Sequence, residues 1–498
     1  MALSRFLTQL ALASSALAVP LWVRDNNTSP GIKWGSCDFE SANLGPIECG
    51  TLAVPLDYTD AASGEKLTLS LIKSPARSNG TTSKSILFNF GGPGYEAIHT
   101  LNSAADLLHL GLGKTLTFSC FDNATERALA MGKYPIEPVD SYENALADTY
   151  ANMQALTNVC NEHNKGSENP KFLGTAFVAR DLMSVVDALG EDGLLRFWGL
   201  SYGSLLGATV AAMFPSRMDR VVLDGVVNAP NYYHRFGIDV DQLLSADAAF
   251  RSILSQCIEA GPAKCALASI NSTAADLEAT LLGAAAKYGK LPIAAGSTVI
   301  NSRLVKELLF IVIKYPGDVA NAAVHISNLV TGTNLTEVAA YYNKLSGDIA
   351  TGNDDAFYGI KCGDTIPRAE SLNDVLPDAE RMMETSELFG PGIASIVTQC
   401  ASWPWAAKEL YGGPFKGIRT RTPVLLFGNT YDPVTPLASA KNMSAAFEGS
   451  VAVEQHGFGH ATISQLSNCT MQVMQAYWAD GTLPAEGTVC EPNTPLFR

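Results

Sequence analysis

The sequence predicts an α/β fold in which a mostly parallel sheet is flanked by helices and interrupted by a large helical insertion. Apolar, strand-like segments alternate with helical segments in residues 37–228 and again in residues 419–498, and such alternation is typical of a parallel sheet with helices on both faces. Residues 229–418 are instead mostly helical, with glycine and proline breaks. We therefore expect a core in two parts, 37–228 and 419–498, and a helical cap at 229–418.

The individual elements follow from apolar periodicity and turn residues. In the first core part we expect strands within 49–58, 65–76, 85–90, 194–200 and 220–228, and helices at 95–110, 143–164, 172–190 and 204–214. In the second part we expect strands within 422–428 and 450–455, and helices at 436–449 and 461–481.

Composition and charge exclude several classes of function. The chain has 498 residues, is 47% hydrophobic and carries a net charge of −15 without a basic patch, so nucleic acid is not expected as a partner. The sequence contains no Cys-x-x-Cys pair, so a zinc site is not expected. No other motif requires a metal or an organic cofactor. After the first residues, no apolar run is long enough for a membrane helix. We expect no cofactor and no membrane partner, and the oligomeric state stays open.

The first eighteen residues resemble a secretory leader. Arg5 precedes the apolar run 6–18, and Ala16-Leu17-Ala18 is a small-x-small cleavage site, which is the pattern of a signal peptide. We expect cleavage near Ala18 and a secreted, extracellular protein, with an uncleaved N-terminal anchor as the alternative.

Cysteines and asparagines agree with secretion. An even number of cysteines in an oxidising compartment indicates disulfides, and nearest-neighbour pairing is the simplest arrangement: Cys37 with Cys49, Cys120 with Cys160, Cys257 with Cys265, Cys362 with Cys400, and Cys469 with Cys490. Glycosylation sequons occur at Asn26, Asn27, Asn79, Asn123, Asn271, Asn334, Asn442 and Asn468. The sequence therefore predicts a disulfide-bonded glycoprotein.

A serine stands between two glycines where a buried strand meets a helix. Gly199-Leu200-Ser201-Tyr202-Gly203 follows the apolar run 194–200 and opens the helical segment 204–214. A Gly-x-Ser-x-Gly turn in this position exposes the serine oxygen at the tip of a sharp bend. A chance match is the alternative, but the flanking strand and helix favour a nucleophile.

A serine nucleophile needs a histidine base and a carboxylate that orients the base. Where this serine turn occurs, the chain order is serine, acid, histidine. Only His456 and His460 lie in the second core part, and His460 stands on a glycine-rich loop after a strand. Asp432 follows the preceding strand. We expect Ser201, Asp432 and His460 to be catalytic, with His456 as the second choice of base and Asp224 as the alternative acid.

The oxyanion formed during attack needs two backbone N–H donors. One is expected from Tyr202, the residue after the nucleophile. The other is expected from the loop Gly91-Gly92-Pro93-Gly94, where glycine permits close approach of a substrate. We expect the Gly92 amide, with Gly91 as the next choice and an ordinary turn as the alternative.

With these motifs in view, the chain resembles the secreted α/β-hydrolase serine peptidases of the tripeptidyl-aminopeptidase and prolyl-aminopeptidase family. The resemblance rests on Asn89–Gly94, Gly199–Gly207, Phe214–Val227, Pro423–Pro436 and Gly457–His460, and on a C-terminal region, about 395–495, like that of the tripeptidyl-aminopeptidase branch. It implies an α/β-hydrolase fold and an aminopeptidase that removes short peptides or single residues from free N-termini.

The resemblance also implies acidic cap residues that bind the substrate's amino group. Asp364 and Asp239 are the candidates in this sequence, although acidic residues on a helical cap are most often only solvated. The substrate is expected to be a peptide or a small ester, because the same catalytic residues on the same fold also cleave non-peptide esters or lactones.

One segment departs from the family pattern. The family has a further core strand after the helix expected at 95–110, whereas here residues 110–113 leave no room for it. Either the sheet changes register, or residues 115–120 replace the strand, or the chain is a shortened product. A catalytically impaired secreted homologue is therefore a further alternative, because a missing strand leaves backbone groups unpaired.

Overall fold

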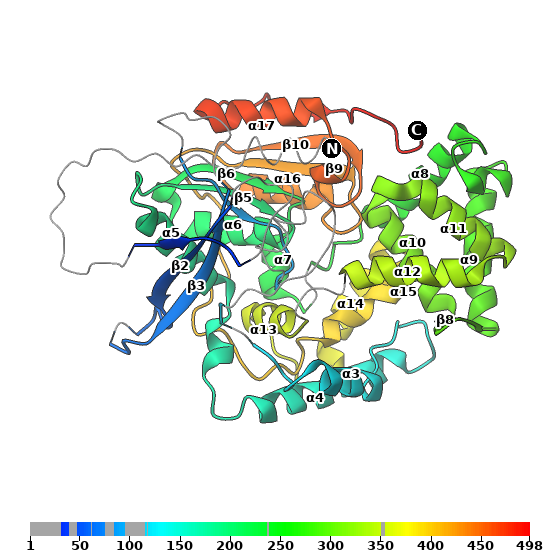
Figure 1. The fold of residues 1–498 in the computed structure, drawn as a ribbon, viewed down its shortest axis with the longest axis horizontal. Coiled ribbons are helices and arrows are strands. Elements are labelled where there is room, and N and C mark those ends of the chain that lie inside the picture. Colours follow the sequence, from blue (N-terminus) through cyan, green and yellow to red (C-terminus); the bar gives the residue numbers. More distant parts are fainter. Residues whose placement is uncertain are drawn as a thin grey trace.

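The computed structural model describes residues 31–38, 47–60, 62–74, 84–94, 115–116, 118–236, 239–349 and 354–498. The predicted leader, the helix expected at 95–110 and residues 110–113 lie outside this part of the chain, as do the sequons at Asn26, Asn27 and Asn79. Figure 1 shows a sheet with its helices beside a separate group of helices.

A parallel sheet forms the centre of the core. Its strands, in spatial order, are β11 (Val489–Cys490), β10 (Val451–Phe458), β9 (Leu425–Tyr431), β6 (Met218–Asp224), β5 (Leu195–Leu200) and β4 (Leu87–Asn89). Each neighbouring pair is parallel. All the strands therefore end at the same edge of the sheet, where ligands bind in open α/β folds. Strand β11 was not expected from the sequence.

Helices cover both faces of this sheet, which confirms the predicted α/β fold. On one face, α5 (Thr175–Leu189), α6 (Tyr202–Met213) and α16 (Leu437–Ala446) pack with Phe197 of β5; on the other, α17 (Asn468–Asp480) packs with Trp198. These two neighbouring residues are both fully buried, because successive side chains of a strand point to opposite faces.

A small antiparallel sheet stands apart from the parallel one. It consists of β1 (Lys33–Gly35), β2 (Glu48–Pro55) and β3 (Lys66–Lys73) and packs on α5 through Leu52, Leu69 and Val185. Residues 118–120 form no strand, and β4 has only β5 as a strand neighbour among the described residues. The described part of the segment 115–120 therefore does not replace the core strand that the family pattern leads us to expect.

The insertion between β6 and β9 is mostly helical, as expected. Its helices are α7 (Ala229–His234), α8 (Ala246–Ala260), α9 (Ala274–Lys290), α10 (Ser302–Lys314), α11 (Val319–Thr331), α12 (Leu335–Ile349), α13 (Asp354–Asp364), α14 (Leu376–Thr385) and α15 (Gly390–Ile393). A hairpin, β7 (Ile293–Ala295) and β8 (Thr298–Ile300), was not expected. Ahead of β5, α3 (Ala124–Lys133) and α4 (Ala145–His163) complete the described helices. No helix in the described residues is long and apolar enough to cross a bilayer.

All ten cysteines are paired. The disulfides join Cys37 to Cys49, Cys120 to Cys160, Cys257 to Cys265, Cys362 to Cys400, and Cys469 to Cys490. These are the nearest-neighbour pairs that the sequence predicts. Five disulfides point to an oxidising, extracellular environment, because thiols remain reduced in most cytosolic proteins.

The C-terminal segment joins the sheet to the cap. After β11 the chain runs toward the cap helices (Figure 1), and the Phe497 ring, only 4% exposed, belongs to the apolar cluster formed by α8 to α11. Phe458, at the end of β10, belongs to the same cluster. Two side chains from the second core part are therefore buried among the cap helices.

Replacing Phe497 with alanine should destabilise the protein by about 3 kcal/mol, because a large ring leaves a cavity in a buried cluster. Urea denaturation followed by tryptophan fluorescence would measure the free energy of unfolding. Leu291→Ala is the matched control, since Leu291 is 75% exposed and its loss should change stability by less than about 0.5 kcal/mol. Equal stabilities for the two variants would contradict the packing described here.

Candidate active site

Ser201 occupies a sharp turn between β5 and α6. Its backbone lies at φ 57° and ψ −125°, a region that residues with a side chain rarely adopt. A Cβ on Gly199 would stand 2.0 Å from the carbonyl oxygen of Gly203, and a Cβ on Gly203 would stand 2.3 Å from that of Asn89. Both glycines of the motif are therefore required by close backbone contacts, and the serine lies at the first turn of α6.

The glycine loop after β4 lies directly against Ser201. A Cβ on Gly91 would be 2.9 Å from the Ser201 Cβ and 3.4 Å from its Oγ. The Gly91 amide donates to Asn89 Oδ1 at 3.0 Å, so it is already engaged. The Gly92 amide has no hydrogen-bond partner among the described residues. This arrangement favours Gly92 over Gly91 as the second oxyanion donor beside Tyr202.

His460 and Asp432 form a buried pair at the same edge of the sheet. The imidazole Nδ1 lies 3.1 Å from Asp432 Oδ2 and 3.2 Å from Oδ1. The side chain of Asp432 is fully buried and that of His460 is 9% exposed. Asp432 follows β9, and His460 stands two residues beyond the end of β10. The two strands are neighbours, which brings the acid and the base together.

Hydrogen bonds keep Asp432 ionised. Burial alone would raise the pKa of this carboxyl, but the adjacent His460 and the backbone amides of Thr435 and Ala461 outweigh it and lower the pKa below its usual value. A carboxylate only accepts hydrogen bonds, so the network assigns the proton of the neutral imidazole to Nδ1 and leaves Nε2 as the basic atom. Thr435 Oγ1 lies 2.8 Å from Asp432 Oδ2 and 3.0 Å from His460 Nδ1.

Asp224 joins the turn of Ser201 to the histidine loop, whereas the carboxylate that contacts His460 is that of Asp432. Its carbonyl accepts from the Ser201 amide at 3.0 Å, and its carboxylate accepts from the backbone and hydroxyl of Thr462 at 2.9 and 2.6 Å. A Cβ on the next residue, Gly225, would meet Ala461 at 3.0 Å. The end of β6 therefore packs between the serine turn and the histidine loop.

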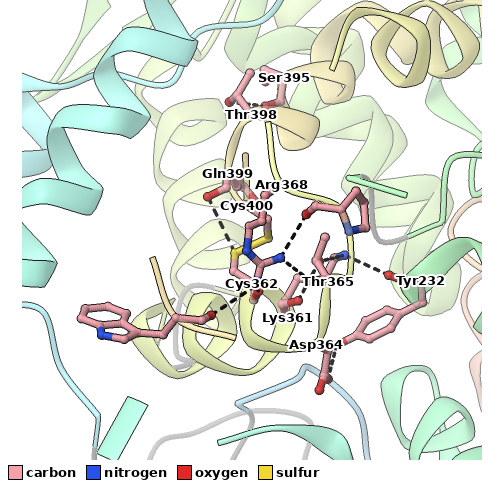
Figure 2. Close-up of a disulfide and its surroundings, with 12 residues drawn as sticks. Tyr232, Lys361, Cys362, Asp364, Thr365, Arg368, Ser395, Thr398, Gln399 and Cys400 are labelled. Atoms are coloured by element: carbon pink, nitrogen blue, oxygen red, sulfur yellow. Dashed lines mark hydrogen bonds between the residues drawn. A yellow bond between two sulfur atoms is a disulfide. The ribbon is translucent and has the colours of Figure 1, made fainter. Parts of the chain in front are cut away.

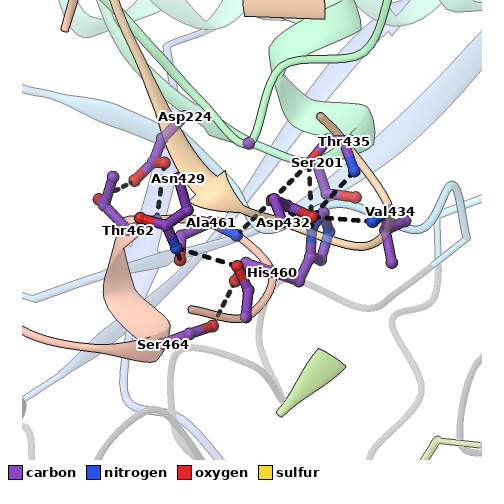
Figure 3. Close-up of polar contacts among 12 residues, drawn as sticks. Ser201, Asp224, Asn429, Asp432, Val434, Thr435, His460, Ala461, Thr462 and Ser464 are labelled. Carbon is purple, nitrogen blue, oxygen red and sulfur yellow. Dashed lines mark hydrogen bonds and ion pairs between the residues drawn. The ribbon is translucent and has the colours of Figure 1, made fainter. Parts of the chain in front are cut away.

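Figure 3 draws Ser201 together with Asp432, Thr435 and His460, on segments that meet at one edge of the sheet. Among the described residues, no hydrogen bond joins the Ser201 hydroxyl to His460 or to any other group. Catalytic hydrogen bonds often form fully only when substrate is bound. The structure thus brings Asp432 and His460 into contact and places Ser201 at the same edge of the sheet (Figure 3).

Comparisons with known proteins place this site on a known kind of hydrolase fold. A family model described as alpha/beta hydrolase fold matches residues 139–252, and one described as TAP-like protein matches residues 386–490. The chain is 25% identical to serine protease Hip1 of Mycobacterium tuberculosis, over 92% of this chain and 91% of that protein. It is 26% identical to tripeptidyl aminopeptidase of Streptomyces lividans, over 93% and 87% of the two chains. It is also 26% identical to putative hydrolase YuaR of Escherichia coli, over 87% and 85%.

The chain has the α/β-hydrolase fold and is a serine hydrolase of the peptidase class. This confirms the family resemblance, the fold and the enzyme class that the motifs predict. The chain extends over most of the length of these relatives, so the likeness is not confined to one part of the hydrolase.

The two acidic residues suggested for substrate binding are both buried in hydrogen-bond networks of this hydrolase. Asp364 is 1% exposed and accepts from the Thr175 amide at 2.8 Å. Asp239 is 1% exposed and accepts from Asn231, at 3.1 Å, and from Ser439, at 3.0 Å. These contacts satisfy both carboxylates within the protein, and neither lies against the nucleophile.

His456, the second choice of base, lies apart from the acid. Its side chain is 48% exposed and its Nδ1 is 3.3 Å from Glu491. Since Glu491 is 71% exposed, this pair lies at the surface of the hydrolase. The geometry favours His460.

The cap contacts the histidine loop directly. The His460 amide donates to the carbonyl of Lys314, the last residue of α10, at 2.9 Å. A Cβ on Gly459 would stand 2.5 Å from Pro316 Cδ, so this close approach needs a glycine. The corner between α10 and α11 thus supports the base from the cap side.

Sequence reasoning missed Thr435 and Thr462. Thr435 contacts both Asp432 and His460, and Thr462 links Asp224 to the histidine loop. Thr435 could have been suspected from its position three residues after the acid in a turn, where hydroxyls commonly bond to a preceding aspartate. Among the described residues, no group of three or more histidine, cysteine or acidic side chains could hold a metal ion.

Replacing Gly203 with alanine should lower the rate of fluorophosphonate labelling by about 100-fold, because the added methyl group collides with Asn89 and displaces the serine turn. Gly283→Ala is the matched control: this helical glycine has open space around its Cβ, and the substitution should leave labelling unchanged. If Gly203→Ala were labelled at the wild-type rate, the close contact would not hold the nucleophile.

Replacing Asp224 with asparagine should change how stability depends on pH. Burial raises the pKa of Asp224 to about 6, against roughly 3.9 in the unfolded chain. Between these values the folded protein binds a proton that the unfolded chain does not bind, so the contribution of Asp224 to stability is full below about pH 4 and falls as the pH rises to about 6. The wild type should therefore lose unfolding free energy relative to Asp224→Asn between pH 4 and 6 in urea titrations. Parallel pH curves would contradict this.

Proposed function

We propose that this chain is a secreted serine exopeptidase that releases short peptides or single residues from free N-termini through an acyl-enzyme. The observation that carries the proposal is the strained Ser201 turn at the same sheet edge as the buried His460–Asp432 pair. Relatives named tripeptidyl aminopeptidase, from Streptomyces lividans and Streptomyces coelicolor, support the choice of substrate class.

In the proposed reaction, Ser201 Oγ attacks the scissile carbonyl carbon while His460 Nε2 accepts the hydroxyl proton. Asp432 accepts a hydrogen bond from the protonated Nδ1 of His460 and stabilises the imidazolium. The amides of Tyr202 and Gly92 donate to the oxyanion. The imidazolium then gives its proton to the leaving amine, and water, deprotonated by His460, hydrolyses the acyl-enzyme and restores Ser201.

Action on chain ends is supported by the position of the cap. The corner of the cap at Lys314 and Pro316 packs against the backbone of Gly459 and His460. A cap folded against the edge that carries His460 suits the end of a peptide better than the middle of a folded chain. The acidic cap residues considered from the sequence are already satisfied within the protein, so other groups would bind the substrate's amino terminus.

Secretion and glycosylation are part of the proposal. The apolar leader ending at Ala18 and the five disulfides support export. Of the predicted sequons in the described residues, Asn123, Asn334, Asn442 and Asn468 are exposed, whereas Asn271 is half-buried. The four exposed asparagines are therefore the better candidates for glycans.

The decisive test combines active-site labelling with substrate length. Fluorophosphonate should label the wild type. Ser201→Ala should abolish labelling and lower turnover by about 10⁶, and Asp432→Asn should lower turnover by about 10⁴ because the imidazole loses its orienting acceptor. Anilides of one, two and three residues should be cleaved with a free amino terminus and resist cleavage when acetylated.

Each other outcome points to a different function. Ser201-dependent labelling with turnover of p-nitrophenyl esters but of no anilide would indicate an esterase. Cleavage of acetylated anilides would contradict exopeptidase action. Absence of labelling in folded, disulfide-bonded protein would indicate a non-catalytic homologue.

A further inference from the structure

A buried polar network lies behind the side chain of Tyr202, whose backbone amide is the proposed oxyanion donor. The Tyr202 hydroxyl is 2.7 Å from Thr175 Oγ1. Asp364 accepts from the Thr175 amide at 2.8 Å, from the Thr175 hydroxyl, and from the Tyr232 hydroxyl at 3.0 Å. The exposed fraction of each of these side chains is at most 5%. The network therefore runs from the nucleophile turn through α5 to the cap helix α13.

The chemistry of the groups decides which of them donates each hydrogen bond in the network. Burial raises the pKa of Asp364 to about 6, although the bonds from Thr175 and Tyr232 and the charge of Lys361 act against that rise. At neutral pH the carboxyl is therefore mostly ionised and only accepts hydrogen bonds. The single hydroxyl proton of Thr175 points to Asp364, so the Thr175 oxygen accepts the proton of the Tyr202 hydroxyl.

The far end of the network is rigidly held. Asp364 ends α13, and Cys362 of the same helix is bonded to Cys400. Figure 2 shows Lys361, Cys362 and Asp364 on this helix beside Tyr232, and the Lys361 ammonium lies 4.6 Å from the centre of the Tyr232 ring. On the other side, a Cβ on Gly174 would be 2.5 Å from Ala407 and 3.1 Å from Asp364. Asp364 is thus a fixed anchor point inside the protein.

The near end of the network needs such an anchor. Tyr202 follows Ser201 directly, and Ser201 is held at a positive φ. A strained backbone persists only where surrounding contacts define it, and oxyanion donors work only when they are held at the position of the developing charge. The Tyr202 side chain is the first group after the nucleophile that can be held from outside the turn.

We propose that Thr175 and Asp364 are positioning residues, which hold the Tyr202 side chain so that its backbone amide stays aligned with the oxyanion. This inference rests on the proposed function, since it takes Tyr202 as an oxyanion donor. It assigns Asp364 to the support of the catalytic turn and not to the substrate's amino group.

Neighbouring residues offer a matched control. Thr209 and Tyr233 form a second buried threonine–tyrosine pair, with 2.8 Å between their hydroxyl oxygens. Thr209 lies on α6, as Tyr202 does, but its pair does not include the residue after the nucleophile. Loss of this hydrogen bond should therefore cost stability as loss of the Thr175 bond does, without displacing the oxyanion donor.

The test measures the second-order rate of fluorophosphonate labelling and the kcat and KM for p-nitrophenyl acetate. Thr175→Val keeps the side-chain shape and removes the hydroxyl; it should lower the labelling rate and kcat by about tenfold and leave KM unchanged. Tyr202→Phe should act alike, and the double variant should be no slower than either single one, because both remove the same bond. Thr175→Ser keeps the hydroxyl, so its labelling rate should stay within about twofold of wild type. Asp364→Asn should lower the labelling rate as much as Thr175→Val does. Thr209→Val should label at the wild-type rate.

The outcomes separate this inference from the proposed function. Labelling that is absent, or independent of Ser201, would contradict the proposed function itself. Ser201-dependent labelling with equal rates for Thr175→Val and Thr209→Val would overturn only the positioning role, as would additive losses in the double variant. Melting temperatures of all variants identify any that fail to fold. If Thr175→Val fails to fold, the labelling rates of Thr175→Ser and Tyr202→Phe are compared instead, and equal rates would overturn the positioning role.

Discussion

The backbone of Ser201 has a positive φ, a conformation that costs a residue with a side chain roughly 1–3 kcal/mol, and closely packed neighbouring elements hold it there. The helix α6 approaches β5 so closely that Gly199 and Gly203 leave no space for a methyl group, and Asn89 of the adjacent strand closes the other side. The sharp strand-to-helix turn therefore requires glycine at both positions. The glycine loop after β4 lies on one side of this turn, and Asp432 and His460 follow β9 and β10 on the other side of β5.

Two buried carboxylates at this edge carry opposite pKa shifts, and the difference separates their roles. Asp432 has the imidazole of His460 beside it, and its pKa is lowered. Burial raises the pKa of Asp224 by more than the hydrogen bonds from Thr462 and the charge of His460 lower it. Asp432 contacts the imidazole directly and is placed to stabilise an imidazolium that forms during reaction. Asp224 ties the serine turn to the histidine loop through hydrogen bonds.

The parts of the site that local sequence patterns describe could be predicted. A serine between glycines after an apolar run, an aspartate one strand before a histidine, and a glycine loop after an earlier strand each depend on their neighbours in the chain. The environment of Asp364 could not be predicted this way, because its partners Thr175 and Tyr232 are 189 and 132 residues away. Similarly, β7, β8 and β11 have two or three residues each, too few to give a periodic pattern, and their pairing depends on tertiary packing.

The histidine loop has supports on both the core and the cap, and this makes the insertion part of the catalytic edge. On the core side Asn429 donates to the carbonyls of Gly459 and Ala461 at 2.9 and 2.7 Å. On the cap side the His460 amide bonds to Lys314, and the Phe458 ring is buried among the cap helices. Because these contacts lie within three residues of the imidazole, its orientation depends on the cap being folded against the sheet. The loop that carries His460 is thus supported jointly by two regions separated by more than a hundred residues of sequence: the core contacts the imidazole through Asp432 and Thr435, and the cap holds the backbone of the loop.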